Sequence, residues 1–142
     1  MKNIELNILR EIDKKVREAE ELFLLNEREK AIIKYKELLD LIPEPKHSWN
    51  ESWAFFYGLS ELYFQNNQFP EALDYLEECV QCPHAIGNPH VHLRIGQIRY
   101  ELGQIEKAKD ELMRAYMGGT IEIFEKEDQK YFSLIQKHVN HL

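Results

Sequence analysis

The stretch that decides the fold is residues 88–116, Asn-Pro-His-Val-His-Leu-Arg-Ile-Gly-Gln-Ile-Arg-Tyr-Glu-Leu-Gly-Gln-Ile-Glu-Lys-Ala-Lys-Asp-Glu-Leu-Met-Arg-Ala-Tyr. Its apolar residues form two stripes with helical spacing. The first stripe consists of Val91, Ile95, Ile98 and Leu102, and the second of Ala108, Leu112 and Ala115. Between them lies Gly103, a residue that readily takes the left-handed conformation at a helix end. The stretch therefore predicts a helical hairpin, whose small inward residues allow the two helices to approach closely.

Two earlier segments repeat this pattern, as they must if the hairpin is to bury its apolar face against neighbours. In residues 53–82 the matching positions are Phe56, Leu59, Tyr63, Ala72, Leu76 and Cys79. A weaker copy contains Ala31, Tyr35 and Leu38 and is closed by Pro43. The equivalent alanines at positions 31, 72 and 108 lie 41 and 36 residues apart, so the connections after the first two copies are long.

These copies resemble the tetratricopeptide repeat, a helix–turn–helix unit of about 34 residues. The third copy matches the family pattern at Ile95, Gly96, Gly103, Ala108 and Ala115, the second at Phe56, Leu59, Tyr63, Phe69 and Ala72, and the first at Ala19, Leu22, Phe23, Ala31, Tyr35 and Pro43. The departures are Ser60 and Asn67 at glycine positions, Cys79 at a small-residue position and His92 at an aromatic position.

The resemblance implies an all-α fold, a superhelix of three helical hairpins with a C-terminal capping helix. We expect one domain over residues 1–142, with hairpins at about 4–43, 50–83 and 89–117 and the cap within 120–140. Ser48 and Glu51 have the spacing of a capping box that would open the third helix. The pair Gly118-Gly119 predicts the end of the last hairpin.

Composition narrows the function. The 142 residues carry a formal charge of −7, which argues against a nucleic-acid interface because such an interface needs a basic face. The chain starts without an apolar leader and has no apolar run long enough to span a membrane, so we expect a cytoplasmic protein. The oligomeric state cannot be inferred from these features.

One cluster has residues that bind metal ions. Cys-x2-Cys followed by histidines can supply a tetrahedral zinc site, and the candidates are Cys79, Cys82, His84, His90 and His92. The competing interpretation is structural, because Cys79 occupies a small-residue packing position and His92 an inward helical position. We favour the structural interpretation and predict no cofactor. Since the motifs of phosphate loops, hydrolases and metalloproteases are lacking, we also predict that the protein is not an enzyme.

In the tetratricopeptide family the first helix of each hairpin lines a concave groove. The resemblance assigns this groove to Arg17, Glu20, Tyr57, Glu61, Phe64, Gln65, Arg94, Gln97, Tyr100 and Glu101, with Leu24 and Leu93 beside them. Tyrosine and arginine are the residue types that contribute most to protein interfaces. Arg17 and Arg94 can meet partner carboxylates, or they can pair with the groove's own Glu20, Glu61 or Glu101.

The sequence therefore predicts a non-catalytic module that binds a protein partner through its groove. The resemblance also extends to small standalone bacterial tetratricopeptide proteins, and implies an immunity protein that neutralises a toxin, whose partner would be a basic domain or peptide. Two alternatives remain at this point: a chaperone or adaptor for a bacterial assembly, and a zinc-binding sensor or enzyme.

Overall fold

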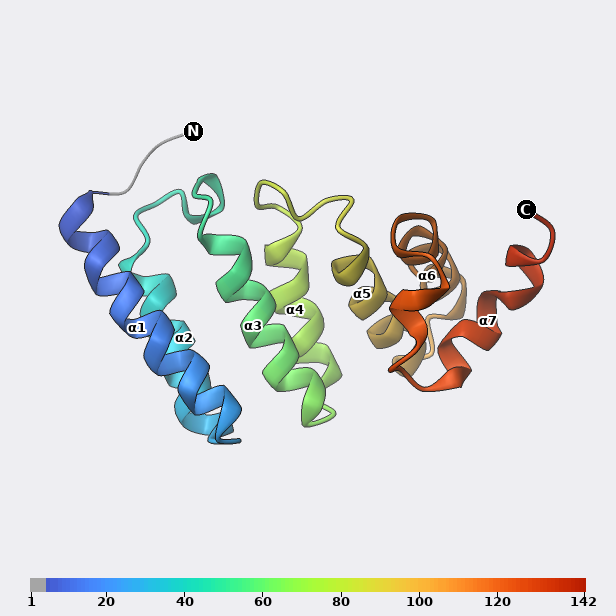
Figure 1. Cartoon of the computed structure of the whole chain (residues 1–142), viewed down its shortest axis with the longest axis horizontal. Coiled ribbons are helices and arrows are strands. Elements are labelled where there is room, and N and C mark those ends of the chain that lie inside the picture. The colour runs from blue at the N-terminus through green and yellow to red at the C-terminus, as the bar shows by residue number, and fades with distance from the viewer. Residues whose placement is uncertain (1–4) are drawn as a thin grey trace. The chain divides into compact units, whose positions relative to one another are not determined.

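The computed structural model describes residues 5–142, and within that range it contains seven α-helices, two short 3-10 helices and no strand (Figure 1). The elements are α1 (Leu6–Leu24), α2 (Arg28–Leu41), η1 (Lys46–Ser48), α3 (Ser52–Gln65), α4 (Phe69–Cys79), α5 (Pro89–Glu101), α6 (Ile105–Gly119), η2 (Ile121–Phe124) and α7 (Gln129–Val139). The predicted all-α class is thus confirmed. Residue 4, where the first helix was expected to begin, lies outside the described residues.

The chain divides into two compact units. The first reaches to His84 and holds the hairpins α1–α2 and α3–α4, and the second, Ala85–Leu142, holds the hairpin α5–α6 with η2 and α7. Each hairpin predicted from the sequence therefore falls wholly within one unit.

The three hairpin turns share one backbone geometry. Each has a residue with positive φ, namely Asn26 at 58°, Asn67 at 58° and Gly103 at 78°. Each turn is closed by the same hydrogen bond, from the third residue after the helix to a carbonyl of the last helical turn. The donors and acceptors are Glu27 N–H and the Leu22 carbonyl (2.9 Å), Gln68 N–H and the Tyr63 carbonyl (2.9 Å), and Gln104 N–H and the Arg99 carbonyl (2.8 Å). This is the Schellman arrangement, in which asparagine can replace glycine at the left-handed position. The turns recur at the 41- and 36-residue spacing that the alanines predicted.

Several of the predicted inward residues lie in the cores. In the first unit Leu38, Leu59 and Leu76 are inaccessible to solvent, and in the second Ile98 and Leu112 are. The expected close approach of helices is present between α5 and α6, because a Cβ atom added to Gly96 would lie 2.7 Å from Leu112 Cδ2. That distance is far shorter than a normal carbon–carbon contact.

Of two local predictions, one is wrong and one is confirmed. Ser48 and Glu51 do not form a capping box: Ser48 ends η1, and Glu51 occupies the N-cap position without a side-chain capping bond. Instead the Ser52 hydroxyl donates to the Lys46 carbonyl at 2.6 Å. The predicted end at Gly118-Gly119 is confirmed, since α6 ends at Gly119 and Thr120 follows it with a φ of 58°.

Across the described residues, no helix combines the length and the apolar character needed to cross a membrane.

Candidate functional site

The first unit contains an apolar pocket of about 430 Å³, formed where α1 and α2 face α3. We call it the α1–α3 pocket, and its lining residues are Glu20, Phe23, Leu24, Tyr35, Trp53, Ala54, Tyr57, Gly58 and Glu61. Pockets of roughly 300–1,000 Å³ with apolar walls and a few polar groups are typical ligand sites in proteins.

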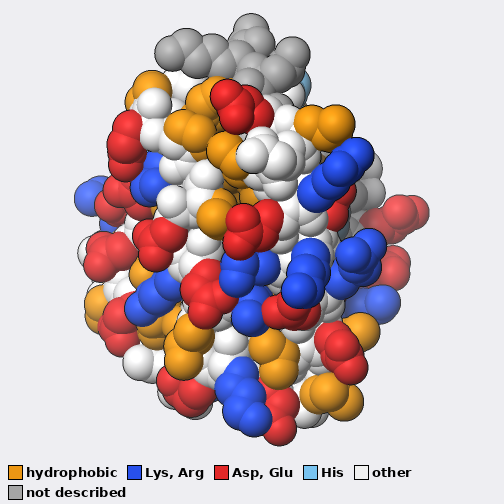
Figure 2. Space-filling model, turned by 90° about the vertical axis from the view of Figure 1, so that its left-hand side faces the viewer, with side chains coloured by type: hydrophobic (Ala, Val, Ile, Leu, Met, Phe, Trp, Pro, Cys, Tyr) orange, Lys and Arg blue, Asp and Glu red, His pale blue; other side chains and the backbone are white. Residues whose placement is uncertain are grey.

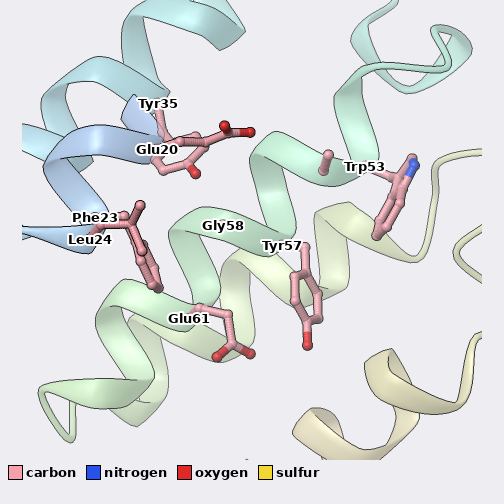
Figure 3. A pocket seen from close by; sticks show the side chains of 9 residues that line it. Glu20, Phe23, Leu24, Tyr35, Trp53, Tyr57, Gly58 and Glu61 are labelled. Carbon is pink, nitrogen blue, oxygen red and sulfur yellow. The ribbon is translucent and has the colours of Figure 1, made fainter. Parts of the chain in front are cut away.

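Helical spacing places these side chains. On α3, Trp53, Tyr57 and Glu61 lie four residues apart and so share one face of the helix. Figure 3 shows Tyr57 and Glu61 with their polar ends turned to the same side, while Phe23 extends from α1 into the space before α3. The Trp53 and Tyr57 rings lie 6.2 Å apart at an angle of 56°. The pocket thus has an aromatic wall on α3 that ends in a carboxylate.

Gly58 allows the opposite wall to come close. A Cβ atom at this position would lie 2.9 Å from both Cε1 and Cζ of the Tyr35 ring. The ring of Tyr35, from α2, therefore lies directly against the α3 backbone. Any larger residue at position 58 would displace it.

The electrostatics of the pocket are negative. Burial raises the pKa of the Tyr35 phenol, and the nearby charge of Glu20 raises it further. Glu20 lies beside Tyr35 in Figure 3, on the side of the pocket opposite Glu61. None of the nine lining residues is basic.

The pocket brings together three of the predicted groove residues, Glu20, Tyr57 and Glu61. The other three predicted in this unit are not among its lining residues. Arg17 is exposed on α1, Gln65 is exposed at the end of α3, and Phe64 packs edge-on against Phe69 with ring centroids 5.7 Å apart.

Sequence reasoning missed much of the pocket wall. Phe23 and Tyr35 follow the core stripe, and they are half-buried because the pocket opens beside them. Trp53 was not singled out, although it lies one turn before Tyr57 on the same face. The four-residue spacing between Trp53 and Tyr57 could therefore have identified Trp53 as part of the same surface.

In the second unit the predicted groove residues contact the chain itself. Arg94 Nη1 donates to Gln97 Oε1 at 2.5 Å and to Glu127 Oε1 at 3.0 Å. Gln97 Nε2 donates to the same Glu127 oxygen at 2.6 Å, and Gln97 is only 1% exposed. Arg94 therefore pairs with a residue just before α7.

The remaining two groove residues of this unit, Tyr100 and Glu101, contact α7. The Tyr131 hydroxyl donates to Glu101 Oε1 at 2.7 Å, and Lys130 Nζ lies 2.7 Å from the same oxygen. The Tyr100 and Tyr131 rings pack edge-to-face at 5.4 Å. In this unit the face of α5 assigned to a partner is thus in contact with the segment 127–131.

The Glu101 contacts predict a pH dependence of stability. Burial opposes ionisation of Glu101, but hydrogen bonds from Lys130 and Tyr131 outweigh it and lower its pKa below the ordinary value of about 4.3. A lowered native pKa stabilises the fold above the unfolded-state pKa, and this contribution is lost as the pH falls through the native pKa. The Glu101→Gln variant should therefore show a shallower loss of stability below about pH 4.3. Urea unfolding of the wild type and of Glu101→Gln at a series of pH values measures this difference in stability.

The matched control for this prediction is Glu125→Gln, which removes an exposed carboxylate from the same unit. Its free energy of unfolding should depend on pH in the same way as that of the wild type. If the stability of Glu101→Gln also falls with pH as steeply as that of the wild type, Glu101 does not stabilise the fold through its ionised form.

The zinc candidates are not arranged as a site. Among the described residues, no group of three or more histidine, cysteine, aspartate or glutamate side chains is placed to hold a metal ion. The Cys79 thiol donates to the Trp53 carbonyl at 3.4 Å and the Cys82 thiol to the Glu78 carbonyl at 3.6 Å. Burial and the neighbouring Cys82 raise the pKa of Cys79 to about 12, and burial and Glu78 raise that of Cys82 to about 11. Both thiols therefore stay protonated at neutral pH.

Among the candidate histidines, His92 takes part in hydrogen bonds within the second unit. The Gly87 N–H donates to His92 Nε2 at 3.1 Å, so the proton of the neutral ring lies on Nδ1, which is 2.7 Å from Glu111 Oε2. His92 is 8% exposed and links the start of α5 to α6. His84 and His90 are exposed.

The surface formed by α1 and α2 carries charges of both signs, unlike the pocket. Figure 2 shows acidic and basic side chains interspersed over this face, with hydrophobic side chains among them. Ion pairs join α1 to α2, including Lys15 with Glu37 (3.0 Å) and Lys34 with Glu18 (2.9 Å). Charges that alternate in this way give no strong local field.

Comparison with known proteins agrees with this architecture. The tetratricopeptide repeat family model matches residues 89–117. Among solved structures, the chain is similar to the C-terminal tetratricopeptide-containing domain of a protein from Plasmodium falciparum described as FK506-binding. That match has a TM-score of 0.67 and 20% identity, and covers 94% of this chain and 89% of that one.

A second similar structure is YrrB, described as a tetratricopeptide protein with an unusual peptide-binding site. The TM-score is 0.63 with 19% identity, over 92% of this chain and 73% of that one. A search of curated proteins gave no match. The chain therefore has a tetratricopeptide-repeat fold, the class of scaffold that typically serves protein–protein interaction.

Proposed function

We propose that this protein is a non-catalytic module that binds a segment of a partner polypeptide in the α1–α3 pocket. The observation that carries the proposal is the pocket itself, in which half-buried aromatic side chains of α1, α2 and α3 surround about 430 Å³ of open space. Large aromatic side chains with partial exposure are the usual energetic centres of interfaces. The fold adds support, because repeat scaffolds present their binding surfaces on such helical faces.

The experiment is site-specific photocrosslinking in the native host. A benzophenone amino acid replaces Ala54, which is exposed and lines the pocket, and in a separate control replaces Asp40, which is exposed on α2 outside the pocket. The proposal expects one polypeptide adduct from position 54 and none from position 40. The recovered partner should then bind the purified Tyr57→Ala variant at least about tenfold more weakly than the wild type. Adducts of equal yield at both positions would refute the pocket as the binding site.

A more specific version is that the protein is a cytoplasmic immunity protein of a bacterium, whose partner is a basic toxin domain. The formal charge of −7 supports it, since opposite net charges accelerate the association of two proteins. Co-expression with the product of the adjacent reading frame should restore growth that this product alone arrests. If the adjacent frames encode secretion or pilus components, the adaptor alternative is favoured.

A further inference from the structure

We infer that His92 is a pH-sensitive switch, which holds residues 86–87 at the start of α5 while its ring is neutral and releases them when the ring binds a second proton. The inference goes beyond the proposed function and does not depend on the α1–α3 pocket, because every residue involved lies in the second unit.

The neutral ring of His92 makes one hydrogen bond with each of its nitrogens. Nε2 accepts the Gly87 N–H at 3.1 Å, and Nδ1–H donates to Glu111 Oε2 at 2.7 Å. Because a neutral imidazole has one donor and one acceptor, these two bonds use both of its nitrogens. Together they join the segment before α5 to α6 through a side chain that is buried.

A second proton on the ring is compatible with only one of these bonds. An imidazolium ring donates from both nitrogens, so Nε2–H and the Gly87 N–H would be two donors directed at each other. The bond from Nδ1 to Glu111 remains, and it becomes stronger because both partners are then charged. Protonation of His92 therefore breaks the contact with Gly87 and keeps the contact with α6.

The charged groups of α6 allow the ring to become cationic within the fold. Glu111 supplies an opposite charge at hydrogen-bonding distance. Asp110 and Arg114 line the same cavity as His92, but Arg114 Nε lies 3.1 Å from Asp110 Oδ2, so their charges largely cancel. An imidazolium that is paired in this way does not leave an isolated buried charge.

The other elements that pack with α5 in this unit add little charge near the ring. On α5 itself, His90 is exposed, and Arg94 is paired with Glu127 at 3.0 Å. Glu122 of η2 is exposed and does not line the cavity beside His92. Glu111 is therefore the charge that acts most directly on the ring.

The groups that separate on protonation both face water. Gly87 and His92 line a cavity of about 540 Å³, where water can bond to the freed N–H groups. Little packing holds this segment, because a Cβ atom added to Gly87 would meet no atom within 4 Å beyond its chain neighbours, and Ile86 is 77% exposed. Loss of the bond to His92 therefore frees residues 86–87, between buried Ala85 and the N-cap Asn88.

The test is an NMR titration of the isotopically labelled full chain from about pH 8 to about pH 5, the range in which histidine changes charge. The nitrogen signals of the His92 ring should show the Nδ1–H tautomer at the upper end and two protonated nitrogens at the lower end. Over the same interval the Gly87 amide should lose at least about fivefold of its protection from hydrogen exchange, relative to the intrinsic rate at each pH. Amides within α5 and α6 should keep theirs.

Three variants identify the group responsible. His92→Gln keeps an acceptor but has no titrating group, so the protection of Gly87 should no longer change with pH. Glu111→Gln removes the opposite charge, so Gly87 should be released at a lower pH than in the wild type. The matched control is His90→Gln, which removes an exposed histidine of the same helix and should leave the wild-type behaviour intact.

Several results would overturn the inference. In the wild type they are an Nε2–H tautomer at about pH 8, a Gly87 amide that keeps its protection while the ring becomes charged, and unfolding of the second unit before the ring titrates. Among the variants they are a pH dependence that persists in His92→Gln, disappears in His90→Gln or is unchanged in Glu111→Gln. The wild-type results need no substitution, so the inference can fail even where a variant does not fold.

Discussion

The Ala108→Arg variant is expected to lose the folded state of the second unit. Ala108 is wholly inaccessible on α6, in the stripe with Leu112 that packs on α5. The close contact between Gly96 and Leu112 leaves no room for a long side chain between the helices. An unpaired buried charge together with overpacking costs about 4 kcal/mol or more, comparable to the whole stability of many small domains. Circular dichroism during heating and hydrogen exchange of α5 and α6 measure the loss.

The control for this prediction is Gln136→Arg, which places the same side chain at an exposed position of α7 in the same unit. It should melt within a few degrees of the wild type. An Ala108→Arg protein that melts at the wild-type temperature would refute the helical register that places Ala108 between α5 and α6.

The second large effect is expected from Arg94→Glu. The substitution removes the bonds from Arg94 to Gln97 and Glu127, and places a carboxylate beside Glu127. The side chains of Arg94 and Glu127 are 16% and 21% exposed, so solvent screens the repulsion only partly. We expect a loss of about 2–3 kcal/mol, with the midpoint of urea unfolding as the measure.

The charge-swapped protein Arg94→Glu/Glu127→Arg is the informative companion. It restores opposite charges at the same two positions and should recover a large part of the loss. From the sequence alone, Arg94 was expected to be available to a partner, and its reversal would then leave stability unchanged. Equal unfolding midpoints for the wild type and Arg94→Glu would support that earlier expectation and contradict the structural role described above.

The helices and their turns could be predicted because they depend on local chemistry. Asn26, Asn67 and Gly103 recur with the spacing of the repeat, and each can take positive φ where most residues cannot. The start of α3 could not be predicted in the same way. There the Ser52 hydroxyl bonds to the Lys46 carbonyl, and this contact depends on how the chain before the helix folds back, which no spacing rule encodes.

The candidate site was predictable only in part, since it depends on contacts between distant residues. Glu127 reaches Arg94 across 33 positions of the chain, and nothing in the pattern of α5 shows that this face is occupied. In the first unit, by contrast, a residue that was expected in the core lines an open pocket. The core stripe assigned Tyr35 to the interior, yet the gap left by Gly58 lets its ring line an open pocket instead.

A substitution at Gly58 could change which ligand the pocket binds without replacing any of its aromatic or acidic side chains. A methyl group at position 58 would lie too close to the Tyr35 ring, so a single added carbon would displace the ring and change the shape of the cavity. Neither carboxylate nor any aromatic group would need to be replaced. Ligand selectivity in proteins built this way can therefore shift by the smallest possible step in side-chain size, through the position of a neighbouring ring.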